Sequence, residues 1–134
     1  MSDTHVHSAT GSFQIAMTPG DGDDTPGVGR WTFDKTFTGA LDGSSRGQML
    51  GSGDPSTGSA GYVVIEMVSA ELDGRSGGFA LQHFGIMDSG GLRQQIEVVP
   101  GTGLGELAEI SGVFTIAVDD DGAHAYELSY SLPN

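Results

Sequence analysis

The sequence predicts a small, antiparallel all-β domain that closes into an eight-stranded, up-and-down barrel. Eight segments of the 134-residue chain have the alternation or the β-branched and aromatic composition of strands. The 23 glycines follow no collagen-like period and are interpreted as turn, bulge and corner positions. No long segment has helical periodicity, and closing a meander of hairpins into a barrel removes its exposed edges.

The expected strands cover residues 12–18, 28–38, 45–52, 61–72, 78–88, 92–99, 112–118 and 124–132. In the second of them, Lys35 is the only lysine of the chain and is the single charged residue on an otherwise aromatic face. The last strand alternates most regularly and places Tyr126 and Tyr130 on one face. Both strands are therefore expected to be half-buried.

Turn-forming residues separate these segments and indicate hairpins between neighbours in the sequence. Such residues occupy positions 73–77, 89–91 and 120–122. The connection after the sixth strand is compatible with one short helical turn over residues 106–110. We expect residues 11–134 to form one barrel domain and residues 1–10 to form a flexible N-terminus.

Composition narrows the classes of partner. The formal net charge is −13, which repels phosphate backbones and anionic lipid headgroups, so neither nucleic acid nor a membrane is an expected partner. The chain has no cysteine, which excludes disulfides, thiolate metal ligands and a cysteine nucleophile. The polar N-terminus has no apolar segment of signal-peptide type, and we expect a cytoplasmic protein.

The sequence indicates no cofactor or metal. His5 and His7 have a spacing that can reach one ion, but we interpret them as part of the flexible terminus. The acidic loop at residues 21–24 lacks the later glycine and glutamate of an EF-hand. The glycines at 101–105 do not have the spacing of a dinucleotide site, and no serine-nucleophile elbow is present.

Two polar residues within apolar strands are candidate catalytic groups. Glu66 has apolar neighbours, and a desolvated carboxylate has a raised pKa suited to general acid or base chemistry. The alternative is that Glu66 faces solvent or pairs with Lys35 or an arginine. His83 shares a face with apolar residues and is either a proton acceptor or a core histidine. A hairpin pairing Leu72 with Gly77 would make Glu66 and His83 direct cross-strand neighbours, whereas a one-residue slip would place them on opposite faces.

Several aromatic residues are candidates for the wall of a ligand cavity, together with Lys35. Small-molecule sites are mostly apolar with a few polar groups, although the same residues can simply fill a core. The aromatic candidates are Trp31, Phe33, Phe37, Tyr62, Phe79, Tyr126 and Tyr130.

Three stretches carry a resemblance to a known family. The run Gly61-Tyr62-Val63-Val64-Ile65-Glu66-Met67-Val68, residues 72–85 and the glycine-bounded turn at 103–112 resemble a bacterial domain-of-unknown-function family over nearly the whole chain. That family is similar in fold to the allene oxide cyclase and dirigent barrels. The resemblance implies an eight-stranded barrel whose cavity admits an apolar molecule, and also a homo-oligomer, but it implies no established activity.

These observations lead to three functional hypotheses. The first is a barrel that binds a small, largely apolar molecule in its interior. The second is a cofactor-free cyclase or isomerase in which Glu66 and His83 exchange protons with the substrate. The third is a structural or interaction module with a filled interior and an apolar patch outside.

Overall fold

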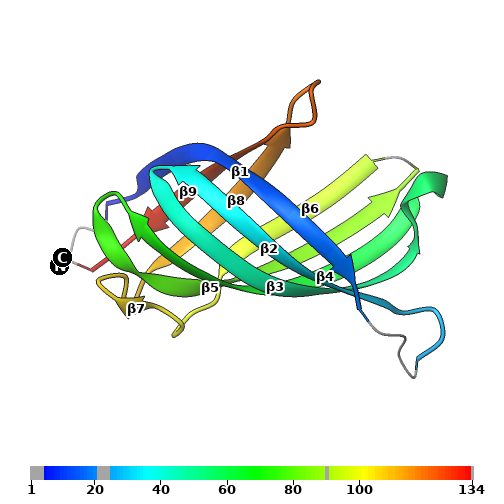
Figure 1. Ribbon diagram of the computed structural model, residues 1–134, viewed down its shortest axis with the longest axis horizontal. Coiled ribbons are helices and arrows are strands. Elements are labelled where there is room, and N and C mark those ends of the chain that lie inside the picture. The colour runs from blue at the N-terminus through cyan, green and yellow to red at the C-terminus, as the bar shows by residue number, and fades with distance from the viewer. Residues whose placement is uncertain (1–4, 21–24, 90, 134) are drawn as a thin grey trace.

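The computed structural model describes residues 5–20, 25–89 and 91–133, which contain nine strands and one short 3-10 helix (Figure 1). The strands are β1 (His7–Pro19), β2 (Gly29–Gly39), β3 (Leu41–Asp54), β4 (Ser59–Leu72), β5 (Arg75–Asp88), β6 (Gly91–Val98), β7 (Leu104–Gly105), β8 (Ser111–Val118) and β9 (His124–Ser131). The 3-10 helix η1 (Pro55–Thr57) joins β3 to β4.

Eight of the strands form a closed antiparallel barrel, which confirms the predicted fold. Each long strand pairs with its neighbour along the chain, and β1 pairs with β9 to close the ring. The additional strand β7 is only two residues long and pairs with β5 at Gly77 and Gly78. All eight predicted strands are present, and β3 begins at Leu41, earlier than expected.

The sheet begins earlier in the chain than the sequence indicated. The first strand starts at His7, which pairs with Tyr130 of β9, and the side chain of Ala9 is completely buried. Residues 7–10 therefore belong to the barrel rather than to a flexible N-terminus. The reason is backbone pairing: the edge of β9 offers hydrogen-bond partners that a polar sequence can use as well as an apolar one.

The expected helical turn over residues 106–110 takes the form of successive tight turns. The amide of Leu107 donates to the carbonyl of Leu104, and the amide of Ile110 donates to the carbonyl of Leu107, each at 3.1 Å. A left-handed backbone at Glu109, with φ of 64°, prevents this segment from continuing as a helix. The turns bury the side chains of Leu107 and Ile110 against the barrel interior.

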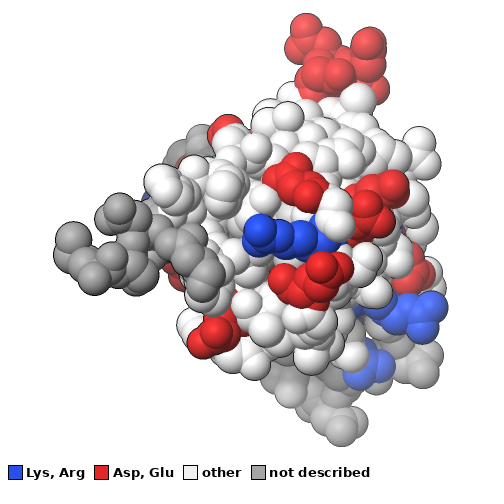
Figure 2. Space-filling view, turned by 90° about the vertical axis from the view of Figure 1, so that its left-hand side faces the viewer, with Lys and Arg blue, Asp and Glu red and all other residues white. Residues whose placement is uncertain are grey.

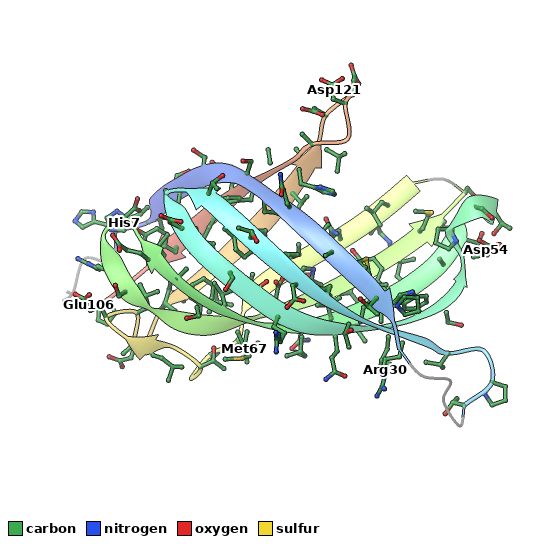
Figure 3. The ribbon with its side chains drawn as sticks, in the orientation of Figure 1. His7, Arg30, Asp54, Met67, Glu106 and Asp121 are labelled. Carbon is green, nitrogen blue, oxygen red and sulfur yellow. The ribbon has the colours of Figure 1, made fainter. Side chains whose placement is uncertain are left out.

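The two ends of the barrel differ. We call the end where β1 begins and β7 lies the closed end, and the end where η1 lies the open end (Figure 3 labels His7 and Glu106 at the former and Asp54 at the latter). The buried cluster occupies the closed half, where Phe114 stacks on Tyr126 with ring centroids 5.5 Å apart. This half of the interior is therefore filled by the protein's own side chains.

The barrel wall is weakest between β6 and β8. Within the described residues these strands pair only at Ile96 with Phe114 and at Glu97 with Val113, whereas β8 pairs with β9 along its whole length. Beyond the two pairs, β6 and β8 diverge toward the open end (Figure 1). The interior is therefore less enclosed on this side.

Acidic side chains dominate the surface at the closed end. Figure 2 views this end and shows a basic side chain near its centre with several Asp and Glu around it. The acidic loop at 119–121 follows the open-half end of β8 and projects upward in Figure 3, where Asp121 is labelled. This distribution agrees with the net charge of −13. No helix within the described ranges has the length and apolar character needed to cross a membrane.

Candidate functional site

A pocket of about 270 Å³ lies inside the open half of the barrel. Side chains from all eight barrel strands line it, and its apolar wall includes Ile15, Met17, Met49, Leu92, Ile116 and Val118. Several of these side chains are well exposed although they line the interior, with Met17 at 45% and Val118 at 60%. The open half thus presents apolar surface to solvent, unlike the filled closed half.

Lys35, Ser45, Glu66 and His83 form a buried polar group that we call the Glu66 cluster. The carboxylate of Glu66 is fully buried and accepts hydrogen bonds from Lys35 Nζ at 2.9 Å, His83 Nε2 at 2.6 Å and Ser45 Oγ at 2.5 Å. Along β4, Glu66 stands between Val64, which lines the pocket, and Val68, which belongs to the core. The cluster therefore lies at the inner end of the pocket.

The close approach of Glu66 depends on Gly47, its partner on β3. A Cβ atom at Gly47 would lie 2.5 Å from Phe33 Cζ and 2.7 Å from Glu66 Cβ. Real Cβ atoms do not approach other carbons so closely, because such overlap forces neighbouring groups to move. Glycine at this position lets the Phe33 ring and the Glu66 side chain pack against the β3 backbone.

The register of the β4–β5 hairpin, which the sequence left open, brings Glu66 and His83 to the same face. The turn between β4 and β5 contains two residues, Asp73 and Gly74, with φ of 49° and 87°, so that Leu72 pairs with Arg75. Asp-Gly is favoured in such two-residue turns because both positions need positive φ. Glu66 is consequently diagonal to His83 rather than opposite it. The shift still leaves both side chains inside the barrel.

The Glu66 cluster keeps the carboxylate ionised. Burial alone would raise the pKa of Glu66, but the His83 hydrogen bond, the Lys35 charge and the Ser45 hydrogen bond outweigh it and lower that pKa. The raised pKa expected from the sequence is therefore wrong, because an isolated carboxylate was assumed. The ion pair with Lys35, considered as the alternative, is what the structure contains.

Lys35 is buried among aromatic rings as well as paired with Glu66. Its side chain is only 4% exposed, and Nζ lies 4.9 Å from the ring centroid of Phe13 and 5.2 Å from that of Phe33. An ammonium over an aromatic face is attracted by the ring quadrupole. These contacts hold the Lys35 ammonium beside the pocket.

His83 is oriented by its hydrogen bond to the Glu66 carboxylate. Because a carboxylate only accepts, Nε2 carries the proton, and in the neutral ring Nδ1 is then an acceptor. Within the described residues Nδ1 makes no hydrogen bond. Every fully buried side-chain nitrogen or oxygen there has a hydrogen-bond partner, so an atom without a partner is not fully buried. Nδ1 is therefore accessible, and the space that His83 lines is the pocket.

The structure divides the predicted site residues between the two halves of the barrel. Phe33, Lys35, Tyr62 and His83 line the pocket, and Glu66 lies directly behind it. Trp31 is half-buried and is not part of the pocket lining. The closed half contains the other four predicted lining residues, Phe37, Phe79, Tyr126 and Tyr130.

The closed-half tyrosines have structural hydrogen bonds. The hydroxyl of Tyr126 accepts from the amide of Leu41 at 2.9 Å and donates to the carbonyl of Thr38 at 2.8 Å. The hydroxyl of Tyr130 donates to the Asp73 carboxylate. These hydrogen bonds anchor the β2–β3 and β4–β5 hairpin ends.

Several residues of the pocket and of the Glu66 cluster were not identified from the sequence. Ser45 was missed because a serine near a strand end carries no distinctive pattern, and Ile116 and Val118 because apolar strand residues are equally common in cores.

The tail histidine His7 packs on Tyr130, with ring centroids 5.2 Å apart. Residues 21–24 of the acidic loop lie outside the described residues. No cluster of metal-binding side chains occurs in the part of the chain that the structure describes.

A larger groove of about 1110 Å³ runs along the outer face of β2 to β5. Its lining includes apolar Leu50, Ile65 and Met67, and Met67 and Arg30 project outward in Figure 3. Its ion pair, Arg46 with Asp34 at 3.0 Å, is highly exposed, and exposed pairs contribute little binding or stability. The inner pocket is the better candidate because its polar groups are buried and fixed.

Comparison with known proteins identifies relatives of the same fold. Residues 9–130 match the family described as a protein of unknown function (DUF3224). A protein of unknown function from the DUF3224 family of Shewanella oneidensis MR-1 has a crystal structure that superposes with a TM-score of 0.87 and 45% identity, covering 94% of this chain and 96% of that one. No curated protein matches the chain. The chain therefore belongs to the DUF3224 family.

Proposed function

We propose that the protein binds a small, largely apolar molecule in the pocket of the open half. The observation that carries this proposal is the set of well-exposed apolar side chains on the interior of a closed barrel, among them Met17 and Val118. Apolar surface left in contact with water is stabilised when a ligand covers it. A concave apolar wall with a few buried polar groups is the usual form of a small-molecule site.

The entrance also suits such a ligand. Leu92 of β6 and Ile116 of β8 line the pocket on opposite sides of the stretch where these strands no longer pair. A ligand can therefore enter from the open end and extend between the two strands without breaking backbone hydrogen bonds. Binding of this kind stabilises the folded protein, and above the dissociation constant the stabilisation grows with the logarithm of the ligand concentration.

A matched pair of variants tests the proposal with a neutral fluorescent probe, N-phenyl-naphthylamine. Met17 in the pocket and Met67 on the outer groove are exposed to almost the same extent, 45% and 47%. We expect Met17→Arg to abolish probe binding, because it places a charge in the apolar wall, and Met67→Arg to leave binding unchanged. Loss of binding in Met67→Arg alone would assign the ligand to the outer groove and contradict the proposal.

A second candidate function is proton transfer in a cofactor-free isomerase or cyclase. The specific observation in its favour is the 2.6 Å hydrogen bond that orients His83 and leaves Nδ1 accessible in the pocket. In this scheme His83 removes a proton from carbon beside a substrate carbonyl and returns it elsewhere, while Glu66 stabilises the imidazolium. The allene oxide cyclase resemblance belongs to this alternative.

Deuterium exchange tests the second candidate without a known substrate. Small cyclic ketones in deuterated buffer should exchange their α-protons faster with the protein, and His83→Gln should remove the acceleration. Equal exchange with and without the protein would count against an enzyme of this type and would leave the binding proposal standing.

The expected location and assembly remain proposals of the same kind. We infer a cytoplasmic location, as expected from the sequence. The homo-oligomer implied by the family resemblance predicts a mass above 13.8 kDa in light scattering, and a monomeric mass would contradict it.

A further inference from the structure

Two side chains of the Glu66 cluster, Lys35 and His83, are the buried polar groups that a ligand would meet. Both line the pocket, and they are 4% and 5% exposed. Glu66 itself is fully buried behind them and accepts hydrogen bonds from Lys35, His83 and Ser45. A ligand therefore contacts the two nitrogen-bearing groups and not the carboxylate.

Lys35 has hydrogen-bond donors to spare. An ammonium carries three N–H groups, and one of them donates to Glu66 Oε1. Within the described residues Nζ has no other hydrogen-bond acceptor, and its further contacts are aromatic rings, the nearest being Phe13 and Phe33. Two donors are thus available to an oxygen atom at the inner end of the pocket.

His83 supplies the complementary acceptor. Its accessible Nδ1 can accept a proton, and Glu66 stabilises the imidazolium that results. With His83 neutral, the charges of Lys35 and Glu66 cancel. When Nδ1 gains a proton, the cluster carries one positive charge that a bound anion can neutralise.

We propose, resting on the binding function above, that the ligand carries one acidic oxygen, as in a carboxylic acid, a phenol or an enol, held by Lys35 and His83. The oxygen accepts a hydrogen bond from Lys35 Nζ. Its proton passes to His83 Nδ1, so that one O–H bond breaks, one N–H bond forms and no other reactant is needed. When the ligand arrives already ionised, His83 Nδ1 takes up a proton from solvent instead, and the bound state is the same.

The apolar part of the ligand occupies the rest of the pocket. Phe33 and Val64 line the region next to the cluster, and Leu92 and Val118 line the region near the divergence of β6 and β8. The ligand class is thus a compact apolar body with one acidic oxygen at its inner end. A cationic head group is disfavoured by the Lys35 ammonium.

A series of four naphthalene probes substituted at the same ring position tests this head-group chemistry. Titration calorimetry with the full chain compares naphthoate, naphthol, methoxynaphthalene and naphthylmethylammonium. We expect naphthoate or naphthol to bind about tenfold or more tightly than methoxynaphthalene, because hydrogen bonds to charged groups are strong, and the cation to bind weakest. The comparison of naphthoate with naphthol distinguishes a carboxylic acid from a phenol or enol.

Variants show which residues produce the preference for an acidic head group. His83→Gln and the double variant Lys35→Met/Glu66→Gln, each checked for folding by circular dichroism, should bind acidic and methoxy probes equally well. Arg46→Met removes an exposed cation from the outer face and should keep the preference. Equal affinity of the acidic and methoxy probes for the wild type, or a preference that survives in both cluster variants, would overturn the inference alone. Failure of all four probes to bind would overturn the binding function with it.

Discussion

Replacing Glu66 with glutamine tests whether the buried ion pair is as tightly coupled as its geometry indicates. Glutamine keeps the shape of the side chain but leaves the Lys35 ammonium, 4% exposed, without a charge partner. Removing one partner of a buried pair costs about 3–5 kcal/mol, because the remaining charge is still desolvated. This loss is a large part of the total stability of a small domain, about 5–15 kcal/mol.

Urea denaturation followed by the fluorescence of Trp31, the only tryptophan, measures this loss. With a denaturant slope of about 2 kcal/mol per molar urea, a loss of about 3–5 kcal/mol lowers the midpoint by about 1.5–2.5 M. Lys35→Met/Glu66→Gln removes both charges and should lose less than the two single variants together, with a coupling of about 0.5–3 kcal/mol. A loss below about 1 kcal/mol for Glu66→Gln, or strict additivity, would refute the reasoning.

The difference in stability between wild type and Glu66→Gln depends on pH. The pKa of Glu66 is lowered from 4.5 in the folded protein, so its stabilising contribution is present above pH 4.5 and is lost as the pH falls through the folded-state pKa. The stability difference between wild type and Glu66→Gln should therefore shrink as the pH falls below 4.5. A difference that stays constant down to full protonation would contradict the lowered pKa.

Three further predictions follow from individual contacts. Gly47→Ala should destabilise the fold by about 1–3 kcal/mol in urea denaturation through overpacking against the Glu66 cluster, and an unchanged midpoint would contradict the close packing. Tyr126→Phe should cost about 1–3 kcal/mol by the same assay, because it leaves the buried amide of Leu41 without its partner. Burial and the Asp73 carboxylate raise the pKa of Tyr130 to about 12, so the stabilisation that its neutral form contributes is lost as the pH rises from 10 to about 12. In ultraviolet absorbance titrations Asp73→Asn should lower that pKa, and identical titration curves would contradict the contact.

Alternation along the strands predicted much of the fold and the aromatic face on which Lys35 lies. The sequence placed Lys35 on the same face as Phe33 and Phe37, and all three side chains are buried. Alternation was less informative in β4, where Val63 and Ile65 face outward and are about half exposed while Glu66 faces inward. A continuous apolar run does not indicate which alternate residues face the interior. In β4 the inward direction of Glu66 is explained by its hydrogen-bond partners on three other strands, Lys35 on β2, Ser45 on β3 and His83 on β5.

The position of the pocket could not be predicted from strand patterns. Tyr62 and Tyr126 are both tyrosines in strands with alternating patterns, yet Tyr62 lines the pocket and Tyr126 belongs to the core of the closed half. The difference depends on the turns that bury Leu107 and Ile110 at one end and on the early loss of pairing between β6 and β8. Both features are set by contacts between segments distant in the sequence.

The register of the β4–β5 hairpin also could not be predicted from the sequence. Residues 73–77 are all compatible with turns, so the sequence allows a longer loop as readily as the two-residue turn that forms. The two-residue difference in pairing keeps Glu66 and His83 on the same face. The sequence thus identified Glu66 and His83 as candidates but left open how their side chains lie relative to each other.

Methionine methyl groups provide the most direct test of the claim that the open half of the barrel binds a ligand. The chain has five methionines, of which Met17 and Met49 line the pocket and Met67 lines the outer groove. In spectra of ¹³C-methyl-methionine protein titrated with naphthoate, the resonances of Met17 and Met49 should shift together while that of Met67 stays in place. Shifts confined to Met67, or no shift at saturating probe, would contradict the account.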